Sequence, residues 1–175
     1  MTIRKYALMT VAGLCTTPAA AQNFAFDVDN TRGGVRISSI NIDDTIYDDT
    51  VGMGVFVESP ISSKIKVGGG FDFWAADDRR ETMTIRDTSF SGYGKFFIVP
   101  HTNEVTPYAV VGSGVHFISR DLPQNDRMNT ELSLDMGAGI DMRITPFIAM
   151  NGEIKIKNVD NYDHTDISVS VISKF

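Results

Sequence analysis

The sequence predicts an all-β fold, an eight-stranded antiparallel transmembrane β-barrel of the up-and-down type. Apolar and polar residues alternate along most of the chain, a pattern typical of strands with one apolar face. After the N-terminal segment, no stretch reaches the roughly 18 uninterrupted apolar residues of a membrane-spanning helix. A chain that crosses a membrane without such helices must form a closed barrel, because every backbone polar group needs a partner.

The N-terminus predicts export. Basic residues 4–5 precede a mostly apolar stretch, residues 6–15, and a run of three alanines ends at Ala21. This order is typical of a signal peptide, here cleaved between Ala21 and Gln22. The expected organisation is a signal peptide, residues 1–21, and one outer-membrane barrel domain, residues 22–175. A buried N-terminal helix and a lipid-modified Cys15 are the alternatives, and Leu14 argues against the second because lipid modification prefers a small residue before the cysteine.

Cleavage leaves an acidic chain without cysteine. The signal peptide contains two basic residues and the single cysteine, so the remaining 154 residues carry 14 basic and 22 acidic side chains, a net charge of −8. Nucleic acid is therefore excluded as a partner, because its phosphates require a basic face. The length fits one domain, and no disulfide is expected.

Period-two alternation predicts where the strands lie. They are expected at residues 34–43, 51–58, 64–76, 90–99, 106–118, 131–144, 147–159 and 166–175. Residues 23–30 also alternate, and either extend the first strand or form a periplasmic arm.

One face of these strands is apolar, and the other carries charges and glycines. Alternation alone also fits a soluble barrel with an apolar lumen. The glycines favour a charged lumen, because long side chains in a narrow barrel need small neighbours. The predicted lumen charge network consists of Lys64, Lys66, Asp72, Lys95, Asp135, Asp141, Arg143, Glu153, Lys155 and Lys157. Its mixed signs predict a salt-bridged plug, whereas a channel usually shows a ring dominated by one sign.

The connections predict the orientation of the barrel. Short connections are expected at residues 59–63, 100–105 and 145–146, and longer charged ones include residues 77–81 and 119–130. Short turns on one rim and longer loops on the other are typical of an outer-membrane barrel, with the short turns in the periplasm.

Aromatic residues near the strand ends predict two membrane-interface belts. The periplasmic belt is expected to contain Phe56, Phe96, Phe97, Tyr108, Phe147 and Phe175. The outer belt is expected to contain Phe71, Phe73, Trp74, Phe90, Tyr93, Phe117 and Tyr162. Trp74 has the parity of the charged face, so its place in the belt requires a bulge or a position above the bilayer.

Three stretches resemble the small outer-membrane barrel family that includes the OmpA transmembrane domain, OmpX and the opacity-type surface proteins. They are Thr-Pro-Tyr-Ala-Val-Val-Gly-Ser-Gly (residues 106–114), Met-Gly-Ala-Gly-Ile-Asp-Met-Arg-Ile-Thr-Pro (residues 136–146) and residues 167–175. The last resembles the family's assembly signal, here Val169, Val171 and Phe175, which the barrel-assembly machinery is thought to read; Ser173 departs from that pattern. The resemblance covers essentially the whole mature chain. It implies a monomer in the bacterial outer membrane, with outer-membrane lipid, lipopolysaccharide and the barrel-assembly machinery as partners.

Catalytic, metal and cofactor sites are not expected. His101, His116 and His164 are predicted in a periplasmic turn, on a strand and in the last loop, without a nucleophilic serine in a matching motif. The aspartate pairs at residues 43–44, 48–49 and 77–78 lack the spacing of a dedicated Ca²⁺ loop. The chain is therefore not expected to be an enzyme.

The expected function is that of a structural or surface-exposed outer-membrane barrel. Its outer loops are available for contact with lipopolysaccharide, host molecules or other cells. The alternatives are a small pore, a lipid-modifying enzyme and a soluble lipocalin-like carrier in the periplasm, because the fold alone does not determine function.

The first prediction concerns processing. The mature protein is expected to begin at Gln22, because residues 19–21 provide the only good cleavage site after the apolar core. N-terminal sequencing or the intact mass of the membrane-inserted form measures this. A chain that begins at lipid-modified Cys15 contradicts it.

Overall fold

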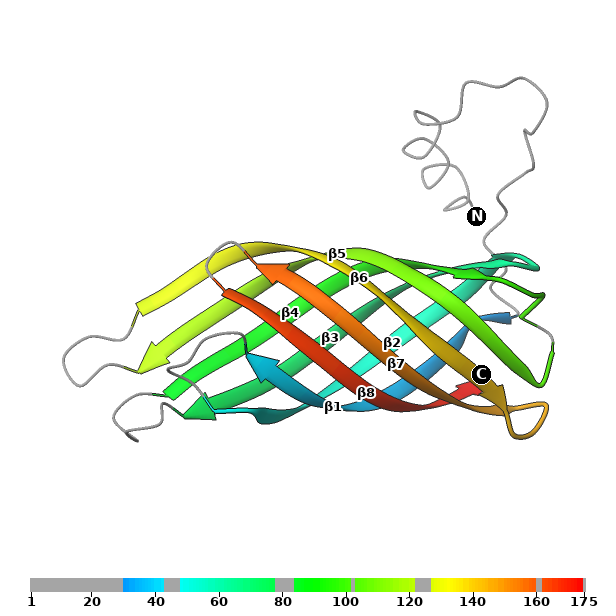
Figure 1. Cartoon of the computed structure of the whole chain (residues 1–175), viewed down its shortest axis with the longest axis horizontal. Coiled ribbons are helices and arrows are strands. Elements are labelled where there is room, and N and C mark those ends of the chain that lie inside the picture. The colour runs from blue at the N-terminus through cyan, green and yellow to red at the C-terminus, as the bar shows by residue number, and fades with distance from the viewer. Residues whose placement is uncertain are drawn as a thin grey trace, which may run out of the picture.

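Eight antiparallel strands close into a barrel (Figure 1). The computed structural model describes residues 30–42, 48–77, 84–101, 103–121, 127–159 and 162–174. The strands are β1 (Arg32–Ile42), β2 (Thr50–Ser62), β3 (Ile65–Asp77), β4 (Thr84–Phe97), β5 (Val105–Asp121), β6 (Arg127–Arg143), β7 (Ile148–Val159) and β8 (Tyr162–Lys174). Each strand pairs with its neighbours in sequence, and β8 pairs with β1 from Arg32↔Lys174 to Ile42↔His164. The predicted fold class is confirmed.

The first residues of β1 and the last residues of β8 lie side by side at one end of the barrel (Figure 1). We name it the periplasmic end, following the orientation expected from the sequence, and the opposite end the outer end. Within the described residues, no helix is long and apolar enough to cross a membrane. Residues 1–29, which include Ala21 and Gln22, and the C-terminal Phe175 lie outside the described residues.

The two faces of the barrel wall differ in polarity. Leu134, Ile154 and Val169 point outward and are 58%, 49% and 56% exposed, whereas Lys66 and Glu153 point inward and are 2% and 7% exposed. The apolar face is therefore outside and the charged face inside. A soluble lipocalin-like carrier needs the reverse arrangement, so the structure argues against that alternative.

Near the outer end the polarity of the two faces changes, and apolar side chains lie inside among buried polar ones. Inward side chains form an apolar cluster, which we name the outer cluster: Ile40, Ile42, Trp74, Ala76, Ile85, Ile118 and Val159. Outward positions at the same level include the exposed Asp77, Arg86 and Thr130. This part of the barrel has the polarity of a water-soluble protein and extends beyond the apolar belt.

This change of polarity explains where the predicted strand bounds were wrong. Residues 119–130 were expected to form a loop, but β5 continues to Asp121 and β6 begins at Arg127. Similarly, β4 begins at Thr84, six residues before its predicted start at residue 90. Polar residues on both faces gave these segments the composition of loops: inside the barrel, Ile85 is apolar, but Asp87 and Ser89 are polar and buried.

The predicted sorting of connections by length was also wrong. The strands are joined by residues 43–49, 78–83, 122–126 and 160–161 at the outer end, and by residues 63–64, 98–104 and 144–147 at the periplasmic end. The connection 98–104 has as many residues as the connection 43–49. The outer rim therefore differs from the periplasmic rim because its strands extend further beyond the apolar belt, and not because its loops are longer.

The aromatic belts are present only in part. Outward rings include Phe71, Phe73, Phe90, Phe96 and Phe147, which are 37–67% exposed. Four other predicted belt residues, Phe56, Trp74, Phe97 and Tyr108, are buried inside the barrel, and Tyr93 packs against the inner apolar clusters. The belts were assigned from distance along each strand, whereas strand parity decides the direction of the ring. The hydrogen-bond ladder between β2 and β3 stays in register at Trp74, so no bulge turns this ring outward. Trp74 therefore lies in the outer cluster.

The second prediction tests the lipid-facing surface. Leu134→Arg is expected to lower the free energy of unfolding in lipid by about 2–4 kcal/mol, because the guanidinium must be placed in hydrocarbon. Met128→Arg is the matched control on the same strand and face, at an outward position 71% exposed near the outer end, and is expected to cost about 0–1 kcal/mol. Equilibrium unfolding of both variants in lipid vesicles measures the difference. Equal costs at the two positions would show that the apolar belt does not face lipid.

Candidate functional site: the closed lumen

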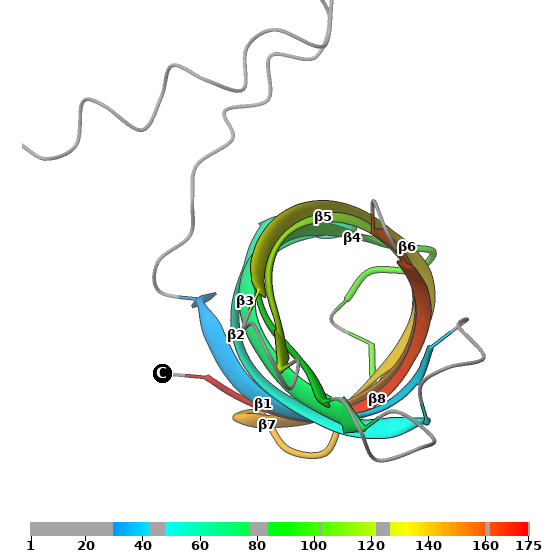
Figure 2. The ribbon, with the colours of Figure 1, turned by 90° about the vertical axis from the view of Figure 1, so that its left-hand side faces the viewer.

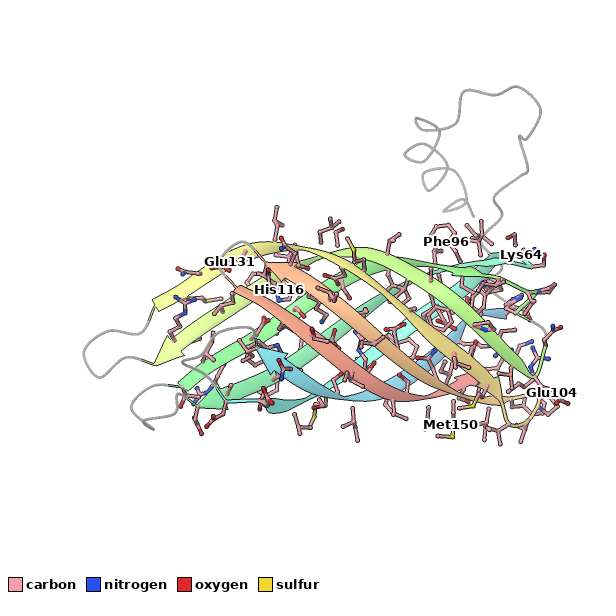
Figure 3. The ribbon with its side chains drawn as sticks, in the orientation of Figure 1. Lys64, Phe96, Glu104, His116, Glu131 and Met150 are labelled. Carbon is pink, nitrogen blue, oxygen red and sulfur yellow. The ribbon has the colours of Figure 1, made fainter. Side chains whose placement is uncertain are left out.

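Buried charged residues fill the middle of the lumen, between apolar side chains at both ends. The outer cluster lies on one side. On the other side lie two smaller clusters, Phe56 with Ala149 and Ile172, and Phe97 with Tyr108 and Val110. Figure 3 shows His116 and Glu131 toward the outer end of the barrel.

An inner network of ion pairs crosses the lumen near the periplasmic end. Lys66 Nζ lies 2.9 Å from Glu58 Oε1 and 2.8 Å from Asp141 Oδ2. Lys95 Nζ lies 3.1 Å from the other Glu58 oxygen and 3.8 Å from Glu153 Oε2. Because Glu58 pairs with both lysines, strands β2, β3, β4, β6 and β7 are tied together through one carboxylate. Such buried charges are stable only when they are paired.

Aromatic and amide groups complete this network. The Tyr108 hydroxyl donates to Glu153 Oε2 at 2.7 Å and accepts from the Asn151 amide at 2.5 Å. Lys95 Nζ also lies 4.9 Å from the centre of the Tyr108 ring and 5.5 Å from that of Phe56. Cation–π contacts of this kind strengthen when the groups are shielded from water.

An outer network lies closer to the outer cluster. Arg36 forms two hydrogen bonds with the Asp72 carboxylate. Lys157 Nζ lies 4.0 Å from Asp72 Oδ2 and 3.4 Å from Asp166 Oδ2. The geometry is that of a fork-like arginine–carboxylate pair extended by a lysine.

Eight of the ten predicted lumen residues lie inside the barrel, and all eight are buried. They are Lys66, Asp72, Lys95, Asp135, Asp141, Glu153, Lys155 and Lys157. Lys64 is instead exposed in the turn between β2 and β3. Arg143 lies half-buried at the periplasmic rim, where its guanidinium donates to the carbonyl of His101 at 3.4 Å. Alternation alone does not show where a strand ends and a turn begins. The prediction that Lys64 and Arg143 lie in the lumen was therefore wrong.

Sequence reasoning missed several buried polar residues. They are Arg36, Glu58, Asp87, His116, Glu131, His164 and Asp166. Asp87 precedes the predicted start of its strand, and Glu58 ends its predicted strand. His164 was expected in the last loop but lies on β8, 1% exposed. Extending two strands by two or three residues would have placed Asp87 and His164 inside, and the parity within the predicted strands would have placed the other five there.

The Asp87–His116 pair has the form of a base held by a carboxylate, with His116 Nδ1 2.6 Å from Asp87 Oδ2. The nearby Ser133 hydroxyl donates to Asp135 at 2.7 Å. The β4–β5 and β5–β6 ladders continue in register past these residues, so the wall beside them is unbroken. Within the described residues, no group of three or more His, Cys, Asp or Glu is arranged to hold a metal ion.

Inward glycines provide the space that the charged side chains occupy. A Cβ on Gly54 would overlap Asp72 Oδ1 and lie 2.7 Å from the carbonyl oxygen of Phe71. A Cβ on Gly70 would lie 2.9 Å from the guanidinium of Arg36. Both glycines therefore make room for the same ion pair.

Comparison with known proteins establishes the family. Residues 7–175 match the family model described as outer membrane protein beta-barrel domain. The chain belongs to this family. The predicted resemblance to small outer-membrane barrels is confirmed, and the protein is assigned to the outer membrane. No curated protein matches the sequence.

Three solved structures of the family's barrel type illustrate the shared fold. Neisserial surface protein A has a TM-score of 0.63 at 14% identity, over 83% of this chain and 96% of that protein. Ail of Yersinia pestis, in complex with the heparin analogue sucrose octasulfate, has a TM-score of 0.59 at 15% identity, over 83% and 97%. The N-terminal β-barrel domain of Pseudomonas aeruginosa OprF has a TM-score of 0.57 at 9% identity, over 82% and 97%. At these identities the similarity establishes the fold alone.

The third prediction tests the glycine positions. Gly54→Ala is expected to lower the free energy of unfolding by about 1–3 kcal/mol, because the new methyl group displaces the Arg36–Asp72 pair. Gly92→Ala is the matched control, since its Cβ would point outward and meet no atom within 4 Å; its effect is expected to stay within about 0.5 kcal/mol. Urea unfolding in the same lipid compares them. A neutral Gly54→Ala would mean that the inward wall tolerates added volume.

Proposed function

We propose that the protein is a closed, non-conducting barrel that presents its outer loops at the cell surface. The observation that carries this proposal is the plugged lumen, in which two ion-pair networks lie between apolar clusters. An eight-stranded barrel has an interior barely wide enough for side chains. Buried side chains of the described residues fill the middle of that interior, so the barrel acts as a membrane anchor for the outer loops.

The charge balance of the lumen supports a plug over a pore. Among the described residues, five lysines and arginines and eight carboxylates are buried inside the barrel. Each of the five cations lies within 4.0 Å of a buried carboxylate, whereas an ion-selective path is usually lined by groups of one sign. A pore would require breaking these pairs, and each separated buried charge costs several kcal/mol (about 3–5).

The charge of the outer connections favours particular partners. Residues 43–49, 77–86, 120–127 and 160–163 contain eleven acidic and five basic residues, a net charge of −6. This rim repels polyanions such as the heparin analogue bound by Ail. It suits cationic surfaces, or lipopolysaccharide phosphates bridged by divalent cations, which favour carboxylate oxygens.

Export and assembly form part of the same proposal. The signal peptide ends at Ala21, and Val169, Val171 and Phe175 form the assembly signal. Val169 and Val171 point outward and are 56% and 47% exposed. Their exposure supports recognition of β8 by the barrel-assembly machinery from the lipid-facing side. The mature protein acts as a monomer with outer-membrane lipid around it.

The fourth prediction separates the anchor from a pore. Purified protein in planar lipid bilayers is expected to show no steady conductance, because ion pairs occupy the lumen throughout its middle section. Single-channel recording measures this, with a general porin in the same lipid as the positive control. Reproducible conductance steps from the unmodified protein would overturn the proposed function and support a small pore instead.

A further inference from the structure

The connection between β4 and β5 lies across the periplasmic opening. Viewed from the outer end, it projects across the lumen (Figure 2, green). Its described residues, 98–101 and 103–104, are fastened on two sides. The His101 amide donates to the Ser63 carbonyl at 2.9 Å, and the Arg143 amide donates to the Glu104 carbonyl at 2.7 Å. These contacts join the connection to the β2–β3 turn and to β6.

His101 makes the central contacts of this connection. Its ring Nδ1 lies 3.0 Å from the Ser63 carbonyl oxygen, so the neutral Nδ1–H form can donate there. The ring packs beside Phe97, with centroids 5.9 Å apart. The backbone carbonyl of His101 accepts from the Arg143 guanidinium at 3.4 Å. One half-buried histidine therefore holds the connection to the turn, to the end of β4 and to β6.

Positive charges surround this histidine. The structural elements packed around it bring Arg32 on β1, Lys64 in the β2–β3 turn, Lys66 on β3 and Arg143 on β6. The nearby acidic groups are Glu104 in the connection and the carboxylates of Glu58 and Asp141, both of which pair with Lys66. Burial and the charges of Lys66, Arg32 and Arg143 lower the pKa of His101 below its usual value, and its hydrogen bond to Ser63 opposes this only in part.

We propose that His101 is a proton-sensitive latch that holds residues 98–101 across the periplasmic opening while its ring is neutral and releases them when the ring is protonated. A proton on the ring adds a positive charge beside Arg32, Lys66 and Arg143, which the released segment avoids by moving into water. This inference adds regulation to the closed barrel and does not depend on the function of the outer loops.

The direction of the pH effect follows from linkage. The closed form binds the proton more weakly than the released form. The latch therefore stabilises the closed form fully at pH values above the usual histidine pKa of about 6.5. The closed form loses this contribution as the pH falls from there toward the lowered pKa of the latched ring. Each unit of pKa difference corresponds to a tenfold change in the closing equilibrium.

Amide hydrogen exchange of the full mature protein in lipid nanodiscs, at pH 7.5 and 5.5, tests the latch. After correction for intrinsic exchange rates, protection of the His101 and Arg143 amides is expected to fall about tenfold on acidification. Amides in the middle of the strands should not change. His101→Gln keeps the backbone hydrogen bond to Ser63 without a titratable ring and is expected to stay protected at both pH values. His101→Lys carries a permanent charge and is expected to be unprotected at both.

Two results would overturn the latch. One is unchanged protection of the His101 amide in the unmodified protein between the two pH values. The other is a pH response that persists in His101→Gln, which would assign it to His116, His164 or the buried carboxylates. If His101→Gln does not fold, Arg32→Gln replaces it, because removing one neighbouring cation should weaken the pH response; an unweakened response there also overturns the latch.

Discussion

The structure depends on one constraint, the need to pair every charge enclosed by a barrel too narrow for bulk water. Glu58 illustrates it, because one of its oxygens accepts from Lys66 and the other forms an ion pair with Lys95, which lies on a different strand. Losing that carboxylate would leave two buried ammonium groups without their shared partner, which is why such a group is costly to remove. The inward glycines follow from the same constraint, since Gly54 and Gly70 leave space for the Arg36–Asp72 pair.

The polarity of the inward and outward side chains changes along the barrel axis, according to whether lipid or water surrounds the wall. Where the outer wall is apolar, the interior holds charges, because lipid replaces the hydrophobic core as the environment for apolar side chains. Nearer the outer end, the outward residues are polar, and the interior holds Trp74, Ile85 and Ile118. There the barrel must supply its own apolar core, as a protein in water does. The boundary between these two regimes therefore marks the edge of the lipid-facing region.

The same boundary limits what the sequence can predict. Inside the lipid-facing region, apolar residues alternate with charges, and the strand positions and the inward side of Lys66, Glu153 and Lys157 follow from parity alone. Beyond it, the inward positions mix apolar residues such as Ile85 with polar ones such as Asp87 and His164, so these two residues had the composition of a loop. The parity of Trp74 indicates an inward ring, whereas its place near the strand end indicates a belt; the structure follows the parity. The particular partners in the lumen, such as Glu58 with two lysines, depend on the register between strands, which composition does not encode.

Apolar side chains lie at both ends of the lumen, and at the periplasmic end a connection fastened by a titratable side chain also lies over them, which bears on regulation. The outer end is closed by aliphatic and aromatic side chains, of which Trp74 packs against the ring of His164 with centroids 5.8 Å apart. The periplasmic end is covered by a connection whose contacts converge on a half-buried histidine among cations. Acidification therefore acts on the lid of one end while the outer cluster keeps the other end closed. A change in pH would let water reach the inner network without opening a continuous path through the barrel, so that proton-dependent release and the absence of conductance are compatible.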